Sequence, residues 1–555
     1  MKRRRQDFDH YLTSISSMTN GPVRERHYKH HIVDRESHQH QMAPSIFLPD
    51  RDQLGSALAI SILALLLPLF LSYVLLRKRW KHEISARQLP PGPWRLPIVG
   101  NLHQLGAVPH RSFFLLSQKH GPLMFLKLGQ LPTCVVSSAK LAREIMKTHD
   151  ATFANRPEFA AANVLCYGCQ DVGFQAYTEA WRRMRKIFVG HFTGPKRAQS
   201  FKSVREEEVE LMVDAISRSA GAPVNLSHLV HALINNITCM MGFGKKYNVG
   251  GYGAQKGRLH DILETTRHLI GGFSLGDFFP SIKWVNWLTG LEFRLRKNFH
   301  ELDHIFDEVL RNHVDPSRRS HEQDFVDSLL EAQKDESEDV PVTTNSIKAL
   351  LLDVLLGGTD TSTSAIVWAM TELMRNPQVM KRVQDELRLK MKGKDKVDEN
   401  DLEQLEYLKL VVKETFRVHP PAPLLIPRVS SKEWVVDGYV IPAKTTIIIN
   451  AWTIGRDPNS WKNPEEFQPE RFINNPIDYK GHDFEYIPFG SGRRICPGIH
   501  LGVIVVEFVL ANLLYSFNWN LPGGLTANDI DMSESPGLTV HKTSDLVLVA
   551  HPYIP

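Results

Sequence analysis

The sequence is poor in cysteine. Only five cysteines stand in 555 residues, and no internal repeat sets them at a regular spacing. So few cysteines exclude a disulfide framework and are typical of a reducing compartment. Cys166 and Cys169 form a C-x-x-C pair, but neither a second pair nor a thioredoxin-like pattern accompanies it. A zinc or redox site at this pair is therefore not expected.

The sequence also lacks a strong charge of either sign. Its 66 Lys and Arg residues against 61 Asp and Glu residues leave a net charge of +5, which is too small to indicate a nucleic-acid partner. The C-terminal part of the chain contains no flavin or nicotinamide fingerprint, so any electrons it uses must come from a separate protein. With 42% hydrophobic residues, the chain has the composition of a globular protein with a large core.

The first 53 residues lack apolar periodicity. They are polar and rich in histidine as far as residue 41, which favours a disordered N-terminal extension over residues 1–53. A metal site among these histidines is the less favoured alternative. Met42 is a possible alternative start, so we expect residues 1–41 to lie outside the folded protein.

One long hydrophobic run, from Leu54 to Leu76, carries no charge. It is long enough to cross a bilayer core about 30 Å thick, which predicts a transmembrane anchor over residues 54–76. Arg77, Lys78 and Arg79 follow at once, and such positive charge marks the cytosolic side. A cleaved signal peptide is the alternative, but no small-residue cleavage site is evident. Residues 77–93 then form a basic, proline-rich linker.

A glycine-rich loop surrounds the last cysteine, in the string Phe489-Gly-Ser-Gly-Arg-Arg-Ile-Cys496-Pro-Gly498. Its glycines allow sharp turns or a close approach to a flat group. The apolar run from Ile499 to Leu514 predicts a helix, whose dipole would stabilise a thiolate at its start. The two arginines could pair with carboxylates. The loop indicates a thiolate presented to a metal, whereas a lone cysteine would more often be a buried structural residue.

Phe489, Gly492, Arg494, Cys496 and Gly498 match, position by position, the haem-ligand signature of one family. The chain therefore resembles the cytochrome P450 superfamily, over about residues 85–555. The resemblance implies a mainly α-helical fold with small β-sheets, in a haem-thiolate catalytic domain over residues 94–555 that follows the single transmembrane helix. It also implies that Cys496 is the axial ligand of haem b, and that the other four residues belong to the cofactor-binding loop.

A second motif interrupts the apolar helix predicted from Ala349 to Met374. The string Gly357-Gly-Thr-Asp360-Thr361-Ser362 places two glycines there, at a cost of about 1 kcal/mol each, and an acid beside two hydroxyls. A packed helix kink is one explanation. The resemblance implies the family's oxygen-activation motif instead, in which Gly357 and Gly358 open a groove while Asp360 and Thr361 deliver protons.

Further residues take roles from the resemblance. Trp181 and Arg185 lie one helical turn apart, where a snorkelling arginine beside a core tryptophan is the simpler reading, but the family uses such a pair to hold a haem propionate. Arg428 could meet a propionate as well. Glu414 and Arg417 alone would be a common surface ion pair. The family joins them to a second arginine, here Arg471, in a buried structural network under the haem.

The resemblance also indicates where a substrate lies. The segment 153–175 matches the variable roof of the family's pocket, and Leu424, Leu425 and Ile426 resemble a strand that passes over the haem and touches substrate. Gly276-Asp-Phe-Phe-Pro280 resembles the plant A-type branch. Two alternating runs, Leu123 to Leu128 and Thr133 to Ser137, predict a small sheet.

The implied function is a monooxygenase in the endoplasmic reticulum membrane, with its catalytic domain facing the cytosol. It would insert one oxygen atom from O2 into a small apolar plant metabolite such as a terpenoid, alkaloid or phenylpropanoid. NADPH would supply electrons through a separate membrane-bound reductase, and membrane lipid would be a further partner. The alternatives are a haem-thiolate isomerase or dehydratase that needs no O2, and a non-catalytic haem-binding membrane protein.

Overall fold

The computed structural model describes residue 64 and residues 88–247, 257–272, 274–318, 323–335 and 339–554. Contacts divide the chain into two units, Met1–Trp80 and Lys81–Pro555. The predicted extension lies outside the described residues, as does the predicted transmembrane anchor apart from Ala64, which is helical. The description below concerns the second unit.

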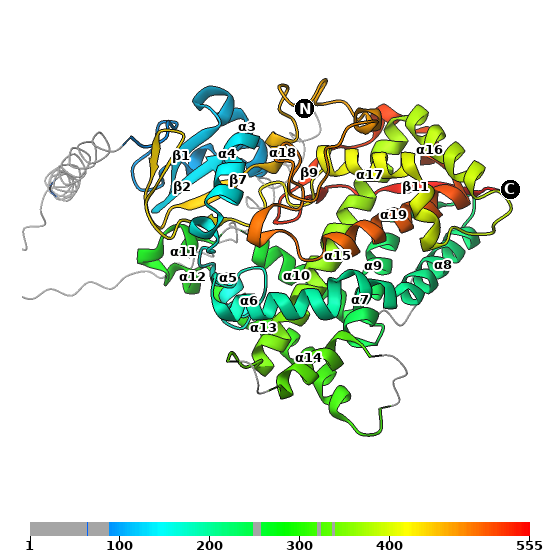
Figure 1. Cartoon of the computed structure of the whole chain (residues 1–555), viewed down its shortest axis with the longest axis horizontal. Helices are drawn as coiled ribbons and strands as arrows, with labels where there is room; N and C mark the ends of the chain where they lie inside the picture. Colours follow the sequence, from blue (N-terminus) through cyan, green and yellow to red (C-terminus); the bar gives the residue numbers. More distant parts are fainter. Residues whose placement is uncertain are drawn as a thin grey trace, which may run out of the picture. The chain divides into compact units, whose positions relative to one another are not determined.

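The second unit is mainly α-helical, as the sequence predicts (Figure 1). Its longer helices are α3 (Pro109–His120), α6 (Glu179–Phe188), α8 (Lys202–Arg218), α9 (Leu226–Phe243), α10 (Arg258–Gly271), α13 (Leu291–Val314), α14 (Phe325–Lys334), α15 (Thr344–Arg375), α16 (Pro377–Lys390), α17 (Glu406–Val418) and α19 (Ile499–Ser516). Short helices join them: α4 (Ala139–Arg143), α5 (Ala160–Leu165), α7 (Pro195–Ser200), α11 (Leu275–Phe278), α12 (Val285–Leu288) and α18 (Ala451–Ile454).

Helix α15 is the axis of the core. It begins at a capping box in which Thr343 and Ser346 satisfy each other's backbone N–H groups, and it ends where Pro377 prevents continuation. Leucine, alanine and isoleucine side chains lie on nearly all sides of α15, and the helix packs against α9, α17 and α19. The predicted helix is confirmed, but it is not interrupted: residues 357–362 are helical.

Two described helices, α15 and α19, are long and apolar enough to cross a membrane by length and composition. Both are mostly buried within the fold. Burial of this kind is typical of core helices, so neither replaces the predicted anchor.

The described strands form four small sheets. One sheet has the order β1-β2-β7-β4, with β1 antiparallel to β2 and β2 parallel to β7. A three-stranded sheet has the order β3-β11-β8. The other two sheets have two strands each, β9 with β10 and β5 with β6. The strands are β1 (Leu123–Leu128), β2 (Leu131–Val136), β3 (Pro223–Asn225), β4 (Arg428–Val429), β5 (Trp434–Val436), β6 (Tyr439–Ile441), β7 (Thr446–Ile449), β8 (Phe517–Asn520), β9 (Glu534–Ser535), β10 (His541–Lys542) and β11 (Val547–Pro552).

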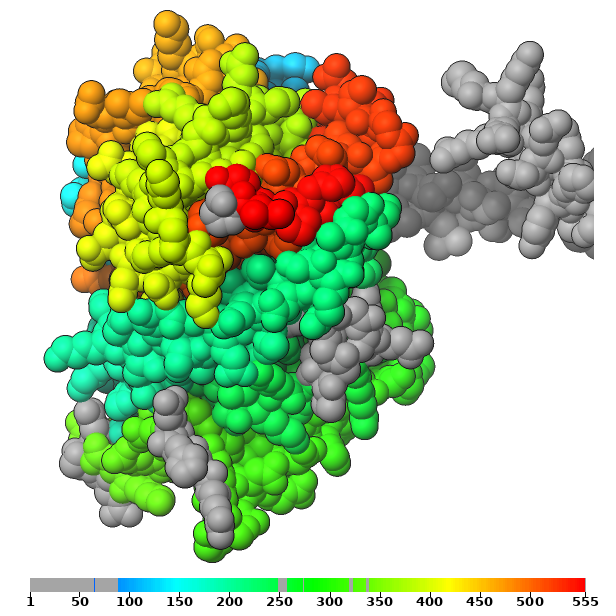
Figure 2. All heavy atoms as spheres, turned by 90° about the vertical axis from the view of Figure 1, so that its right-hand side faces the viewer, coloured from blue at the N-terminus to red at the C-terminus, as the bar shows by residue number. Residues whose placement is uncertain are grey.

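The predicted strands at 123–137 are confirmed, with the second one shifted to Leu131–Val136. The strand predicted at Leu424–Ile426 is wrong. These residues form a turn in which Leu425 has a φ of 52° and its N–H donates to the Ala422 carbonyl, so pairing begins only at Arg428. On the face drawn in Figure 2, the C-terminal strand β11 (red) lies between α8 (teal) and the segment that contains α16 (yellow-green).

Candidate active site

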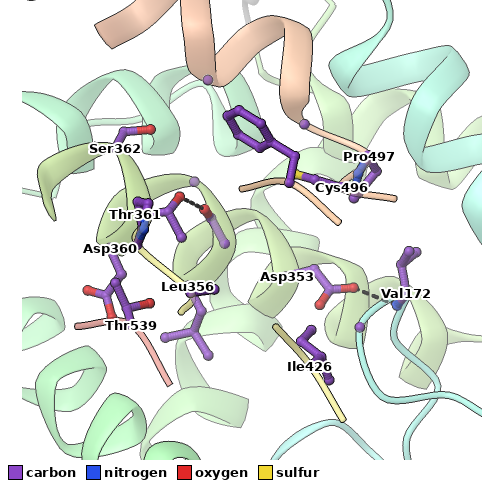
Figure 3. Close-up of a pocket in the computed structure, with 18 of the residues that line it drawn as sticks. Val172, Asp353, Leu356, Asp360, Thr361, Ser362, Ile426, Cys496, Pro497 and Thr539 are labelled. Atoms are coloured by element: carbon purple, nitrogen blue, oxygen red, sulfur yellow. Dashed lines mark hydrogen bonds between the residues drawn. The ribbon is translucent and has the colours of Figure 1, made fainter. Parts of the chain in front are cut away.

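A cavity of about 340 Å³ lies beside α15 in the middle of the fold. Its wall is mainly apolar, and it is formed by α15, α9, the loop before α19, the roof segment 153–175 and the turn before β4. Figure 3 shows Cys496 and Pro497 on one side, with Asp353, Asp360 and Thr361 of α15 on another. The cavity therefore brings together two motifs that lie more than a hundred residues apart in the sequence.

The loop that carries Cys496 turns sharply because two of its glycines have left-handed backbone angles. Gly490 has a φ of 72° and Gly492 a φ of 70°. A Cβ on Gly492 would lie 2.1 Å from the Met146 carbonyl oxygen, so no other residue fits there. Gly498 differs, since it has an ordinary φ of −94° and serves as the N-cap of α19.

The Cys496 N–H donates to the Phe489 carbonyl at 2.9 Å, which closes the loop. Phe489 lines the cavity and packs edge-on against Phe416, with ring centroids 5.1 Å apart. Burial raises the pKa of the Cys496 thiol, while the Gly498 N–H and the Arg185 charge oppose that rise. The loop thus presents one sulfur to the cavity, where the Gly498 N–H and the Arg185 charge offset part of the effect of burial.

Four arginines, which we call the cationic cradle, line the cavity on the side of the roof segment: Arg156, Arg185, Arg428 and Arg494. Arg494 lies 4.1 Å above the Trp181 ring and donates to the Ala154, Val172 and Gln175 carbonyls. Arg185 donates to the Ile495 carbonyl at 2.5 Å, one residue before Cys496. The structure therefore brings Trp181, Arg185, Arg428 and Arg494 together, as the motifs suggest.

Asp150 is a site residue that sequence reasoning missed. It is buried, and it accepts from Arg428 Nη1 at 2.7 Å and from the Arg493 N–H at 2.8 Å. Arg493 itself is half exposed and donates to the Tyr177 hydroxyl, so its guanidinium stands outside the cradle. Arg156 was missed as well. Neither residue belongs to a motif, and only the fold brings them to the loop.

On the α15 side, Gly357, Gly358, Asp360 and Thr361 all line the cavity. The Thr361 hydroxyl donates to the Gly357 carbonyl at 2.7 Å. A Cβ on Gly357 would meet no atom within 4 Å, so this glycine opens directly onto free space. Asp360 Oδ2 lies 3.7 Å from Arg267 Nε and 3.9 Å from His541 Nε2.

The remaining wall is apolar and carries a second acid on α15. Leu425 and Ile426 line the cavity, whereas Leu424 packs in a separate core beside the first sheet, which corrects its predicted substrate contact. The turn at Leu425 explains this, because it sends neighbouring side chains in different directions. Asp353, which sequence reasoning missed, faces the cavity and accepts a hydrogen bond from the Val172 N–H at 2.6 Å.

All five cysteines are free, as predicted.

Glu414, Arg417 and Arg471 form one compact network. Arg417 donates to both oxygens of Glu414 at 2.8 Å, and Arg471 Nε donates to Glu414 at 2.9 Å. Glu414 and Arg417 are fully buried, and Arg417 also binds three carbonyls, those of Gly455, Pro464 and Glu466. Every charge in this network has partners within the chain.

The comparisons agree with this geometry. The sequence matches the family described as Cytochrome P450 over residues 90–549. The chain belongs to this family. Cytochrome P450 71A9 of Glycine max is 50% identical to this P450, over 84% of this chain and 94% of that protein. Strychnine-11-hydroxylase of Strychnos nux-vomica is 47% identical, over 86% of this chain and 94% of that protein. The chain is thus a plant cytochrome P450 and a monooxygenase, as its sequence predicts.

A solved structure shows the same fold. A zebra fish cytochrome P450 with abiraterone has a TM-score of 0.66 and 24% identity to this chain. The match covers 80% of this chain and all of the zebra fish chain. The mainly helical P450 fold is therefore confirmed for the second unit.

The charges of the cavity fit the haem b that the P450 family binds. Burial and the neighbouring arginines lower the pKa of Arg494 to about 9 and lower that of Arg156 well below its usual value. Among the described residues, the four guanidiniums have Asp150 and Asp171 as nearby buried acids, and burial keeps the pKa of Asp353 in the same wall well above its usual value, so positive charge is in excess. Two propionates would neutralise it, and Cys496 would supply a thiolate to the iron.

Proposed function

We propose that this P450 is a membrane-anchored monooxygenase that inserts one oxygen atom from O2 into a small apolar plant metabolite. Electrons would come from NADPH through a separate reductase in the endoplasmic reticulum membrane. The observation that carries this proposal is a single cavity lined by Cys496, by the Asp360–Thr361 pair and by an apolar wall. A relative is named as a hydroxylase of strychnine, which supports a specialised metabolite as the substrate class.

The chain's own residues have separate tasks in this proposal. When bound, a thiolate-ligated haem would supply the oxygen activation. Cys496 holds the cofactor, and the cradle orients its carboxylates. Leu425, Ile426 and their apolar neighbours exclude water and orient the substrate. Asp360 carries a proton to the Thr361 hydroxyl, which delivers it beside Gly357.

The first test uses the full-length protein in microsomal membranes. The reduced protein with carbon monoxide should show the strongly red-shifted Soret band of a thiolate-ligated haem, and Cys496→Ala should abolish it. With reductase, NADPH and isotopically labelled O2, the product should carry one labelled oxygen atom. Turnover without NADPH or O2 would favour the isomerase or dehydratase alternative, and a haem spectrum without any product over a broad substrate screen would favour the binding protein.

Thr361→Ala should uncouple oxygen consumption from product formation. The variant lacks the hydroxyl that hydrogen-bonds to Gly357, so proton delivery should fall by roughly 10²- to 10⁴-fold while NADPH oxidation continues. Peroxide and product are measured per NADPH consumed. Thr361→Ser keeps the hydroxyl and is the matched control. Equal coupling in all three proteins would remove Thr361 from the proton path.

A further inference from the structure

The turn at residues 171–175, which we call the roof strap, leads into α6 and is bound by acids through its backbone N–H groups. The Val172 N–H donates to Asp353 Oδ2 at 2.6 Å, which Figure 3 draws as a dashed line. The Phe174 N–H donates to Asp171 Oδ2 at 2.7 Å. The strap is thus fastened to α15 through one carboxyl group and to itself through another.

The carbonyl groups of the same strap face the cationic cradle. The Val172 carbonyl accepts from Trp181 Nε1 at 3.0 Å and from Arg494 Nη1 at 3.3 Å. The Gly173 carbonyl accepts from Arg156 Nε at 2.9 Å, and the Gln175 carbonyl accepts from Arg494 Nη2 at 2.5 Å. The strap is therefore a layer of peptide groups with acids on its N–H side and cations on its carbonyl side.

The two carboxyl groups converge on the strap. A Cβ on Gly173 would lie 3.1 Å from Asp171 Oδ2 and 3.5 Å from Asp353 Oδ1. Asp353 also stands one helical turn before Gly357, so it belongs to the same wall of α15 as the glycine groove. Removing an acceptor from a buried N–H leaves that group unsatisfied, which is costly.

We propose that Asp353 is a positioning residue of this P450. It holds the roof strap against α15, and through the strap it fixes Trp181, Arg494 and Arg156 in the orientation that receives the haem carboxylates. Because Val172, Gly173 and Phe174 also line the cavity, the same contact sets the substrate wall. The inference rests on the proposed function in one respect, since it takes the cradle to hold haem.

The test compares Asp353→Leu, Asp353→Ser and Asp353→Asn in the full-length holoprotein. Leucine has no acceptor and serine does not reach Val172, whereas asparagine keeps a carbonyl oxygen at the same position. The rate of haem transfer to excess apomyoglobin should rise roughly ten- to hundredfold in the leucine and serine variants. It should stay within about threefold of the wild type in the asparagine variant, since the N–H keeps an acceptor.

Amide hydrogen exchange is the second readout, because it does not depend on activity. Faster exchange in Asp353→Leu should be confined to peptides that contain residues 171–175 and the start of α6. Asp307→Leu is the matched control: Asp307 contacts α15 through Lys348 at 2.6 Å but does not touch the strap. It should change neither haem transfer nor strap exchange.

The outcomes separate the two proposals. A wild-type protein without thiolate-ligated haem would contradict the proposed function, while strap exchange would still test the role of Asp353. If wild type binds haem and Asp353→Leu retains it equally well, the positioning role is wrong. It is also wrong if Asp353→Asn loses haem as fast as Asp353→Leu does, or if amide hydrogen exchange in Asp353→Leu rises evenly over the whole chain. If Asp353→Leu does not fold, Asp353→Ser carries the same comparison.

Discussion

Two buried arginine clusters near the Cys496 loop differ in how their charges are balanced, although the sequence points to members of both. In the Glu414–Arg417–Arg471 network, each charge has partners in the chain. In the cationic cradle, Arg156, Arg185, Arg428 and Arg494 outnumber the buried acids that face them. A complete cluster stabilises the fold, whereas an incomplete one indicates where a ligand supplies the missing charge.

Glu414→Ala should have the largest effect on stability. It removes the carboxylate that two buried guanidiniums share, so Arg417 keeps a buried charge without its counter-ion. We expect the free energy of unfolding to fall by about 3–5 kcal/mol, whether or not haem is bound. Chemical denaturation of both forms measures this. Glu470→Ala is the control on the adjacent turn, since that acid is 42% exposed and its partners Arg382 and Tyr407 lie outside the network; an equally small loss in both variants would contradict the structural role.

The difference between the clusters also separates what the sequence could predict from what it could not. Cys496, Glu414 and Arg494 stand in contiguous strings whose spacing is itself informative. Asp150 and Arg156 have no such string, and chain folding alone brings Asp150 to the Arg493 N–H of the loop and Arg156 to the Ile426 carbonyl. Leu424 was misplaced because a left-handed backbone angle at Leu425 leaves no trace in a hydrophobic pattern.

Asp171 should make the free energy of unfolding depend on pH below neutrality. Burial raises its pKa to about 6, against the Phe174 N–H and the charges of Arg156 and Arg494, while the unfolded chain ionises near 3.8. In the native state Asp171 therefore stays protonated to a higher pH than in the unfolded chain. The free energy of unfolding should fall as pH rises from about 4 to about 6, by up to about 3 kcal/mol.

Thermal unfolding across this pH range measures the slope attributed to Asp171. Asp171→Asn cannot ionise and should flatten the slope, while Asp315→Asn, at a surface acid, should leave it unchanged. Asp353 and the Cys166 thiol share the buried site, and burial raises both of their pKa values. An unaltered slope in Asp171→Asn would therefore assign the pH dependence to another group of this buried site.

Arg494→Met should have the smallest effect on stability, and this is the sharpest contrast with Glu414→Ala. Methionine removes the Arg494 donor from the Ala154 and Gln175 carbonyls, while the Val172 carbonyl keeps Trp181 Nε1, and it also removes a buried charge that Arg428 and Arg185 repel. These effects oppose each other, so the haem-free protein should change by less than about 1 kcal/mol. The haem-bound protein should lose the cofactor roughly tenfold faster, because a charge-assisted hydrogen bond to a carboxylate is lost. Arg493→Met is the matched control, since the neighbouring guanidinium is half exposed and outside the cradle. If Arg494→Met destabilised the haem-free protein as strongly as Glu414→Ala does, the cradle would be a second structural network, and its excess positive charge would no longer indicate a ligand.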